Sequence, residues 1–203
     1  ELGDADLVGK ALSGGVESTK EALCACDEKA QAKAILATTT ASGITEVAAA
    51  TKRPQNVIGM NFVFNPFDEK CVVQITKGFE TSEEAAQACK NLVEQAGAMA
   101  IVLRDSPGLV LDRVIASVIN EAVIVVATGT ASVEDVDNIT KLCLNWPLGP
   151  FEFADTIGID NVVATLEVLS QQFGQRFLPC RLLKQMVAAG QLGKKTGKGF
   201  YTY

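Results

Sequence analysis

Short apolar runs alternate with helical patterns in the first half of the chain. The runs predict strands at residues 4–12, 34–38, 56–64, 71–75 and 98–103. Helices are predicted at residues 16–26 and 44–51, and from Thr81 to about Gln95. Such alternation is typical of a layered α/β domain with parallel strand pairs, which we assign to residues 1–104.

The second half, residues 105–203, is predicted to be helical throughout. Its first long helix carries one apolar stripe, formed by Leu111, Ile115, Val118, Ile119, Ala122 and Val126. This stripe is wider than contact with a single neighbouring helix requires. We therefore expect it to meet other helices of the same chain and a second polypeptide.

Punctuating residues mark the ends of the predicted helices. Gly129 is expected to end the first long helix, because glycine is favoured just past a helix end. Ser132 is expected to cap the next helix, and Asp160 a later one. Between them, the stretch from Trp146 to Pro150 predicts a rigid connector.

Composition and charge narrow the class of protein. The net charge of -6 gives no general attraction to nucleic acid or to an anionic membrane. No apolar run approaches the roughly 18 residues of a membrane span. The scattered cysteines indicate free thiols in a reducing compartment, and Cys24-x-Cys26 in a chain without His does not predict a zinc site. Because the chain begins with Glu1, we expect a fragment or a processed product.

Several motifs occur in one consistent order along nearly the whole chain. They are Ile58-Gly59-Met60 with Asn65-Pro66, Pro107-Gly108-Leu109-Val110-Leu111-Asp112-Arg113, Gly129-Thr130-Ala131-Ser132-Val133-Glu134-Asp135-Val136-Asp137, Pro147-Leu148-Gly149-Pro150 and the tail Gly193–Tyr201. Each motif alone is weak, but the ordered set resembles the 3-hydroxyacyl-CoA dehydrogenases. The resemblance implies a Rossmann-like NAD-binding domain followed by a C-terminal helical dimerisation domain.

The glycine-rich turn that holds a dinucleotide is not found in the sequence. Members of this family bind the pyrophosphate of NAD with a G-x-G-x-x-G turn, whereas Ser13-Gly14-Gly15 lacks that spacing. By resemblance, the chain enters the family pattern at about the fourth strand, and we expect the first mononucleotide half to be missing. The family's acidic nucleotide-contacting position falls near Gly14. The tail from Gly193 to Gly199 is interpreted as a closing turn, because it also lacks the spacing of a phosphate-binding loop.

The resemblance also assigns residues to the catalytic positions. In the family, a His takes the proton of the 3-hydroxyl while hydride passes to NAD, a Glu orients that His, and a Ser and an Asn bind the substrate oxygen. The matching catalytic positions hold Thr40 for Ser, Asn61 for His, Gln74 for Glu and Asp112 for Asn. Counting back from Asn65-Pro66 would place Phe62 at the His position instead. Asn65 itself matches a substrate-binding position.

All four catalytic positions differ from the family pattern. Neither Asn61 nor Phe62 accepts a proton at neutral pH, and Gln74 cannot offset the charge of an imidazolium ion. Asp112 is a weak base for an alcohol at its ordinary pKa of about 4. Three interpretations remain open: polar groups hydrogen-bonded locally, a remodelled site with Asp112 as base, and a binding pocket without chemistry.

The resemblance implies a protein of the NAD-dependent, β-oxidation type that acts on 3-hydroxyacyl-CoA. We expect this polypeptide to be inactive alone and not to bind NAD tightly. The alternative is a non-catalytic dimerisation or acyl-CoA-binding subunit of a larger complex. We expect a homodimer or heteromer formed through the helical domain, in the cytoplasm or the mitochondrial matrix.

Overall fold

The computed structural model describes residues 4–10, 16–39, 43–64 and 71–203. By its internal contacts the chain divides into two units, one up to Leu109 and the other from Val110 to Tyr203. The sequence pattern had placed this division between residues 104 and 105. Each unit has its own hydrophobic core and is described by itself.

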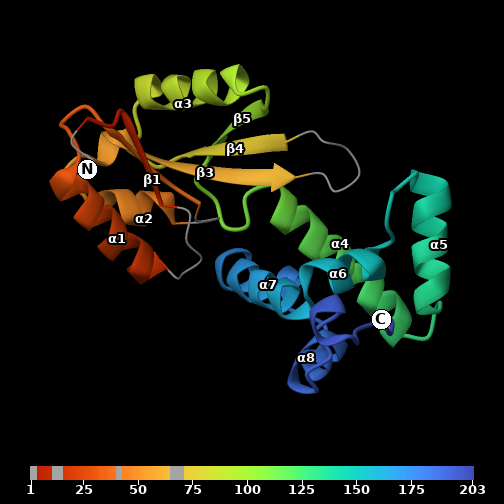
Figure 1. Cartoon of the computed structure of the whole chain (residues 1–203). Helices are drawn as coiled ribbons and strands as arrows, with labels where there is room; N and C mark the ends of the chain where they lie inside the picture. The colour runs from red at the N-terminus through yellow and green to blue at the C-terminus, as the bar shows by residue number, and fades with distance from the viewer. Residues whose placement is uncertain (1–3, 11–15, 40–42, 65–70) are drawn as a thin grey trace. The chain divides into compact units, whose positions relative to one another are not determined.

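The first unit is built on a five-stranded sheet (Figure 1). Its strands are β1 (Leu7–Lys10), β2 (Ile35–Thr38), β3 (Val57–Phe64), β4 (Cys71–Lys77) and β5 (Met99–Arg104), and their order is β1-β2-β3-β4-β5. The β1–β2, β2–β3 and β4–β5 pairs are parallel, as predicted. The β3–β4 pair is antiparallel, so the expectation of parallel pairs was wrong there. Only residues 65–70 join these two strands, whereas a parallel pair needs a crossover of about a dozen residues.

Helices cover both faces of this sheet. Helices α1 (Val16–Lys29) and α2 (Ile44–Ala49) lie on one face, and α3 (Glu83–Gln95) lies on the other (Figure 1). The 3₁₀ turn η1 (Pro54–Asn56) leads into β3. Ser82 caps α3 by accepting a hydrogen bond from Ala85 N at 3.1 Å. All the predicted strands and helices of this unit are confirmed, with shifted ends; α1 runs to Lys29 rather than to residue 26.

The second unit is helical, as predicted. It consists of α4 (Leu111–Ala127), α5 (Val133–Leu144), α6 (Pro150–Ile157), α7 (Ile159–Phe173) and α8 (Arg181–Ala188), with 3₁₀ turns η2 (Gln175–Phe177) and η3 (Lys194–Thr196). Helix α4 contacts α6, α7 and α8. Ile119, Val123, Phe151, Leu166 and Leu183 are fully buried in the core that these four helices share.

The apolar stripe predicted on α4 is only partly buried. Ile119 and Ala122 face the core, as expected, but Leu111 in the first turn is 37% exposed. Ala116 and Val123 are buried in its place. The buried face of α4 therefore starts at Ala116, and it packs against α6, α7 and α8.

The predicted helix ends are confirmed in two of three cases. Gly129 follows α4 with a φ of 73°, and Ser132 forms a capping box with Asp135 at the start of α5. Asp160 does not cap a helix, because α7 begins one residue before it. Gly158, at a φ of 96°, lets α7 follow α6 directly, and the Asp160 carboxylate instead pairs with Lys195 Nζ at 2.5 Å.

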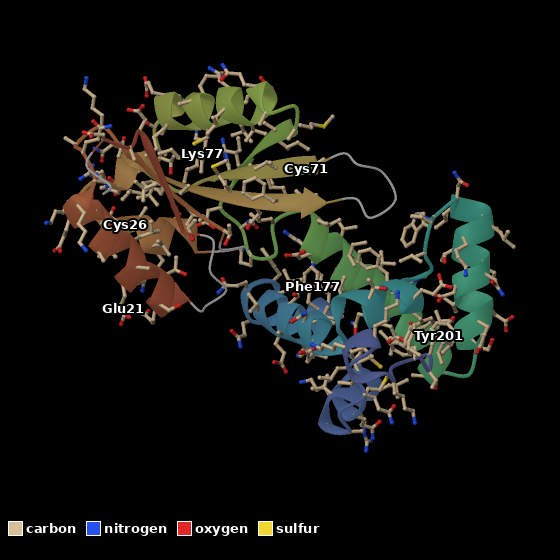
Figure 2. The ribbon with its side chains drawn as sticks, viewed as in Figure 1. Glu21, Cys26, Cys71, Lys77, Phe177 and Tyr201 are labelled. Carbon is tan, nitrogen blue, oxygen red and sulfur yellow. The ribbon has the colours of Figure 1, made fainter. Side chains whose placement is uncertain are left out.

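Two buried carboxylates fix the C-terminal segment to the helices. Asp155 on α6 accepts hydrogen bonds from the backbone N–H groups of Phe200 and Tyr201 at 3.0 and 2.9 Å. The Tyr201 hydroxyl, on the side chain labelled in Figure 2, donates to Asp137 on α5 at 2.9 Å. The tail is thus a glycine-rich closing turn, as expected, with Gly193 backbone paired to Lys198.

Membrane spans and metal clusters were sought among the described residues. None of their helices has the length and apolar character needed to cross a bilayer. Nor do they contain a group of three or more Cys, Asp or Glu side chains placed to hold a metal ion. All six cysteines are free thiols, in agreement with the sequence-based expectation.

Candidate functional site

Asn61 on β3 and Gln74 on β4 lie directly opposite each other across the antiparallel pair. Phe62 pairs with Val73, so its side chain points to the other face of the sheet. Of the two candidates for the family's His position, Asn61 is therefore the one that faces the Gln74 position. Directly opposed side chains on antiparallel strands have Cβ atoms about 4.5–5.5 Å apart, which is close enough for direct contact.

The face that carries Asn61 and Gln74 is the one covered by α2. Gly59, two residues before Asn61, lies on the same face, and a Cβ atom there would come within 2.8 Å of Ile44 Cδ1. This glycine lets Ile44 of α2 approach β3 closely. The packing of α2 at Gly59 therefore fixes β3 two residues before Asn61. Gln74 is buried at 8% exposure, Asn61 is half-buried, and neither residue lacks an interaction partner.

The other two predicted residues of the first unit, Thr40 and Asn65, lie outside the described residues. The backbone at the start of α2 is held by a carboxylate from the end of β5. There the Asp105 carboxylate accepts hydrogen bonds from Gly43 N at 3.2 Å and from Thr45 N at 2.8 Å. Asp105 thereby joins the start of α2 to the end of β5.

The opposed side chains of Asn61 and Gln74 both carry neutral amides. A neutral amide donates and accepts hydrogen bonds and does not take a proton at neutral pH. This pair can position a hydroxyl or carbonyl oxygen. It does not supply the group with a pKa near neutrality that alcohol oxidation needs.

Asp112 lies in the second unit, in the first turn of α4, at a cavity of about 260 Å³. We call this the Asp112 cavity; its lining includes Leu111, Asp112, Ile115, Phe153, Asn161 and Thr165. Partial burial raises the pKa of the Asp112 carboxyl, although the residue as a whole is exposed to solvent. Its carboxylate can accept hydrogen bonds from a group in this cavity.

The described strands do not fit a bound dinucleotide by themselves. Dinucleotides bind in a crevice where the strand order reverses, and the described order runs from β1 to β5 without reversal. The turn between β1 and α1, residues 11–15, lies outside the described residues. The described residues therefore do not form a pyrophosphate site by themselves.

Sequence reasoning missed the residue that bounds the Asp112 cavity from the far side. Phe153 on α6 lines this cavity together with Ile115 and Ala116 on α4. Phe153 lies 37 positions after Ala116 in the sequence. Phe153 lies one turn after Pro150, the last residue of the predicted connector. A large aromatic residue one helical turn past a rigid connector is the only sequence signal that could have pointed to it.

Comparison with known proteins gives the same assignment for both units. Residues 1–106 match the family model for the 3-hydroxyacyl-CoA dehydrogenase NAD binding domain. Residues 108–203 match the model for the 3-hydroxyacyl-CoA dehydrogenase C-terminal domain. The two matches follow each other in the order of the two structural units.

Individual relatives agree with the family models. The chain is 42% identical to a protein of Bacillus subtilis named probable 3-hydroxybutyryl-CoA dehydrogenase, over all of this chain and 71% of the relative. It is 40% identical to 3-hydroxybutyryl-CoA dehydrogenase of Clostridioides difficile, over all of this chain and 73% of that relative. The crystal structure of (S)-3-hydroxybutyryl-CoA dehydrogenase PaaH1 from Ralstonia eutropha matches with a TM-score of 0.93 at 38% identity, over 98% of this chain and 70% of that one. The chain therefore belongs to the 3-hydroxyacyl-CoA dehydrogenase family.

Proposed function

We propose that this polypeptide binds acyl-CoA as a family member but does not by itself oxidise 3-hydroxyacyl-CoA. The observation that carries the proposal is the pairing of Asn61 with Gln74. By resemblance, their positions are those of the family's catalytic His and Glu, and both hold amides. The strand geometry that would orient a base is present, while the base is not.

The physical cost of that replacement is large. Oxidation of the 3-hydroxyl requires removal of its proton as hydride leaves the adjacent carbon. A positioned general base contributes about 10²–10⁴ to the rate of such a step. The amides of Asn61 and Gln74 can hold the substrate oxygen by hydrogen bonds, so binding is retained while proton transfer is lost.

A remodelled site with Asp112 as base is the second candidate function. Its support is the raised pKa of Asp112 together with its place at a cavity. Under this alternative the chain would catalyse the family reaction with a carboxylate in place of an imidazole. The two candidates differ in one respect that can be measured, which is whether the rate of NADH formation depends on Asp112.

The proposed ligand is a short-chain 3-hydroxyacyl-CoA of the kind formed in β-oxidation. The relatives in Bacillus subtilis and Clostridioides difficile are both named for 3-hydroxybutyryl-CoA, which carries a four-carbon acyl group. NAD is the cofactor that the family's NAD binding domain implies. We propose a reducing compartment, the cytoplasm or the mitochondrial matrix, because the six cysteines are free thiols.

Calorimetric titration of the 203-residue chain tests the binding part of the proposal. Butyryl-CoA should bind, whereas NADH should not bind with a dissociation constant in the low micromolar range. The second expectation follows from the unreversed order of the described strands and from a sequence without G-x-G-x-x-G. Tight NADH binding, or no butyryl-CoA binding at all, would refute the proposal.

We also propose that the chain associates through its helical unit, as a homodimer or within a heteromer. Helices α4 and α5 expose large apolar side chains: Val114 is 53% exposed, Ile124 37%, Ile139 58% and Leu142 85%. Exposed apolar surface of this extent on consecutive helices supports a protein partner.

Sedimentation velocity with matched charge variants tests this association. A charge placed in a buried, unpaired interface costs several kcal/mol, so Val114→Asp should shift the chain towards monomer. Glu134→Lys, at an exposed position of α5, should leave the association unchanged. A monodisperse monomer at tens of micromolar, with no partner recovered from the native extract, would contradict the proposal.

A further inference from the structure

A second cavity in the helical unit adjoins the Asp112 cavity. It has a volume of about 210 Å³, and we call it the Trp146 cavity; its lining includes Ile115, Val118, Trp146, Leu148, Pro150 and Phe153. Ile115 and Phe153 line both cavities. These two side chains therefore form a common wall between them.

The two cavities differ in chemistry. The Asp112 cavity carries a carboxylate, the Asn161 amide and the Thr165 hydroxyl, all of which can contact a polar group. The Trp146 cavity is lined by aliphatic and aromatic side chains. Its volume exceeds the roughly 150 Å³ of an apolar cavity known to admit benzene. It therefore has room for several methylene groups.

The common wall is held by rigid elements on both sides. Ile115 lies one turn after Asp112 on α4, so both side chains point to the same face. Phe153 lies in the first turns of α6, whose start is fixed by the buried Asp137 carboxylate. Asp137 accepts hydrogen bonds from Phe151 N at 2.9 Å and from Glu152 N at 3.1 Å.

Gly149 strengthens this anchoring. A Cβ atom at position 149 would lie 2.2 Å from Asp137 Cγ, so the chain approaches the carboxylate as closely as only glycine allows. The backbone that carries Phe153 is thus positioned directly by contacts with α5. A side chain on such a support keeps its place when a flexible ligand is bound.

We propose that Phe153, with Ile115, sets the upper limit on acyl chain length by separating the Asp112 cavity from the Trp146 cavity. This inference rests on the proposed function, in which the chain binds acyl-CoA. A four-carbon acyl group occupies the Asp112 cavity and ends at the Phe153 ring. A longer chain reaches the Trp146 cavity only when that ring is shortened.

The only tryptophan of the chain lines the cavity in question, so its fluorescence reports directly on occupancy. The experiment titrates the 203-residue chain with butyryl-CoA and octanoyl-CoA and follows both Trp146 emission and calorimetric heat. In the unchanged protein, octanoyl-CoA should bind no more tightly than butyryl-CoA, and neither ligand should alter the emission.

Shortening the wall should change the response to the longer ligand alone. Burial of each additional methylene raises affinity about fourfold (about 0.8 kcal/mol), so Phe153→Ala should favour octanoyl-CoA over butyryl-CoA by at least about tenfold. The same variant should show a change in Trp146 emission with octanoyl-CoA only. Ile115→Ala shortens the wall from the other side and should act in the same direction.

Two further variants keep the test decisive. Phe153→Leu preserves more of the side chain if Phe153→Ala folds poorly, and it should give a smaller preference of the same sign. Val168→Ala shortens an apolar side chain on α7 that is 43% exposed and lines neither cavity, and it should bind both ligands like the unchanged protein.

Three outcomes would overturn the inference. The first is an octanoyl-CoA preference of tenfold or more in the unchanged protein. The second is an unaltered preference in both Phe153 variants and in Ile115→Ala while butyryl-CoA still binds. The third is Trp146 emission that follows protein concentration and not ligand, which would mean that a second copy fills the cavity. If no variant binds butyryl-CoA, the proposed function itself fails, and this inference with it.

Discussion

Asn61 and Gln74 face each other across β3 and β4 on the sheet face covered by α2. The register of an antiparallel pair sets this relationship, and a slip by one residue would place Phe62 opposite Gln74 instead. The seven paired positions from Ile58 to Phe64 hold the register. This register therefore places two amide side chains opposite each other on that face.

The pairing predicts how an imidazole introduced at position 61 would titrate. In Asn61→His with Gln74→Glu, the carboxylate lies beside the imidazole and should raise its pKa by about one unit or more over that in Asn61→His alone. NMR titration of the imidazole carbon protons measures both values. Equal pKa values in the single and double variants would show that the two positions are not in contact.

The buried ion pair between Asp27 and Arg53 should be the most sensitive electrostatic contact of the first unit. Asp27 is 2% exposed, its carboxylate lies 2.5 Å from Arg53 Nε, and the guanidinium also donates to the carbonyl groups at the end of α1. Removing one partner leaves a buried charge unpaired, so Arg53→Met should cost about 3–5 kcal/mol of unfolding free energy. Urea unfolding followed by circular dichroism measures the loss.

Lys20 provides the matched control for this prediction. It pairs with Glu17 and Glu46, whose side chains are largely exposed, and such solvent-screened pairs contribute little to stability. Lys20→Met should therefore change the unfolding free energy little. If both variants lowered the unfolding free energy by the same amount, burial would not explain the contribution of the Asp27–Arg53 pair to stability.

The link between Tyr201 and Asp137 should stabilise the helical unit. Burial and the hydrogen bond to Asp137 together raise the pKa of Tyr201, as expected for a phenol that donates to a buried carboxylate. A hydrogen bond to a charged group contributes about 1.5–3 kcal/mol, so Tyr201→Phe should lower the unfolding free energy by that amount. Tyr203→Phe, at a residue 53% exposed, should cost less because water can replace its hydroxyl.

The lowered pKa of Glu152 should make the fold less stable in acid. Burial pushes the pKa of Glu152 up, but hydrogen bonds from Lys141 and Gly149 N outweigh it and hold the pKa below its ordinary value of 4.5. A carboxyl whose pKa is lower in the folded state stabilises the fold above its unfolded pKa, and this contribution disappears as the pH falls through the folded pKa. Urea midpoints measured from pH 6 to pH 3 should therefore fall less steeply for Glu152→Gln than for the unchanged protein. Glu134→Gln, at an exposed position, should follow the unchanged curve.

Much of the fold could be predicted from local patterns because local physics decides it. The Ser132 cap and the end of α4 at Gly129 depend on a few neighbouring residues, and both are confirmed. Ser82 caps α3 for the same reason. The ordered family motifs likewise identified the two domain types, which the family models confirm.

Features that depend on contacts between residues far apart in the chain could not be predicted from the sequence. The antiparallel β3–β4 pair follows from the short connection between the strands, which strand periodicity does not reveal. Asp160 was predicted to cap a helix, but Gly158 holds the N-cap position of α7. The Asp160 carboxylate forms an ion pair with Lys195 instead. The wall formed by Ile115 and Phe153 joins two helices through side-chain packing, for which the sequence carries no periodic signal.

Steady-state formation of NADH is the measurement that tests the central claim most directly. The 203-residue chain is mixed with NAD and (S)-3-hydroxybutyryl-CoA, and absorbance of the reduced nicotinamide is followed at neutral pH. With amides at positions 61 and 74 we predict no oxidation above the trace level of a blank without protein. Sustained NADH formation would contradict the account, and its loss in Asp112→Asn would identify the carboxylate of Asp112 as the base.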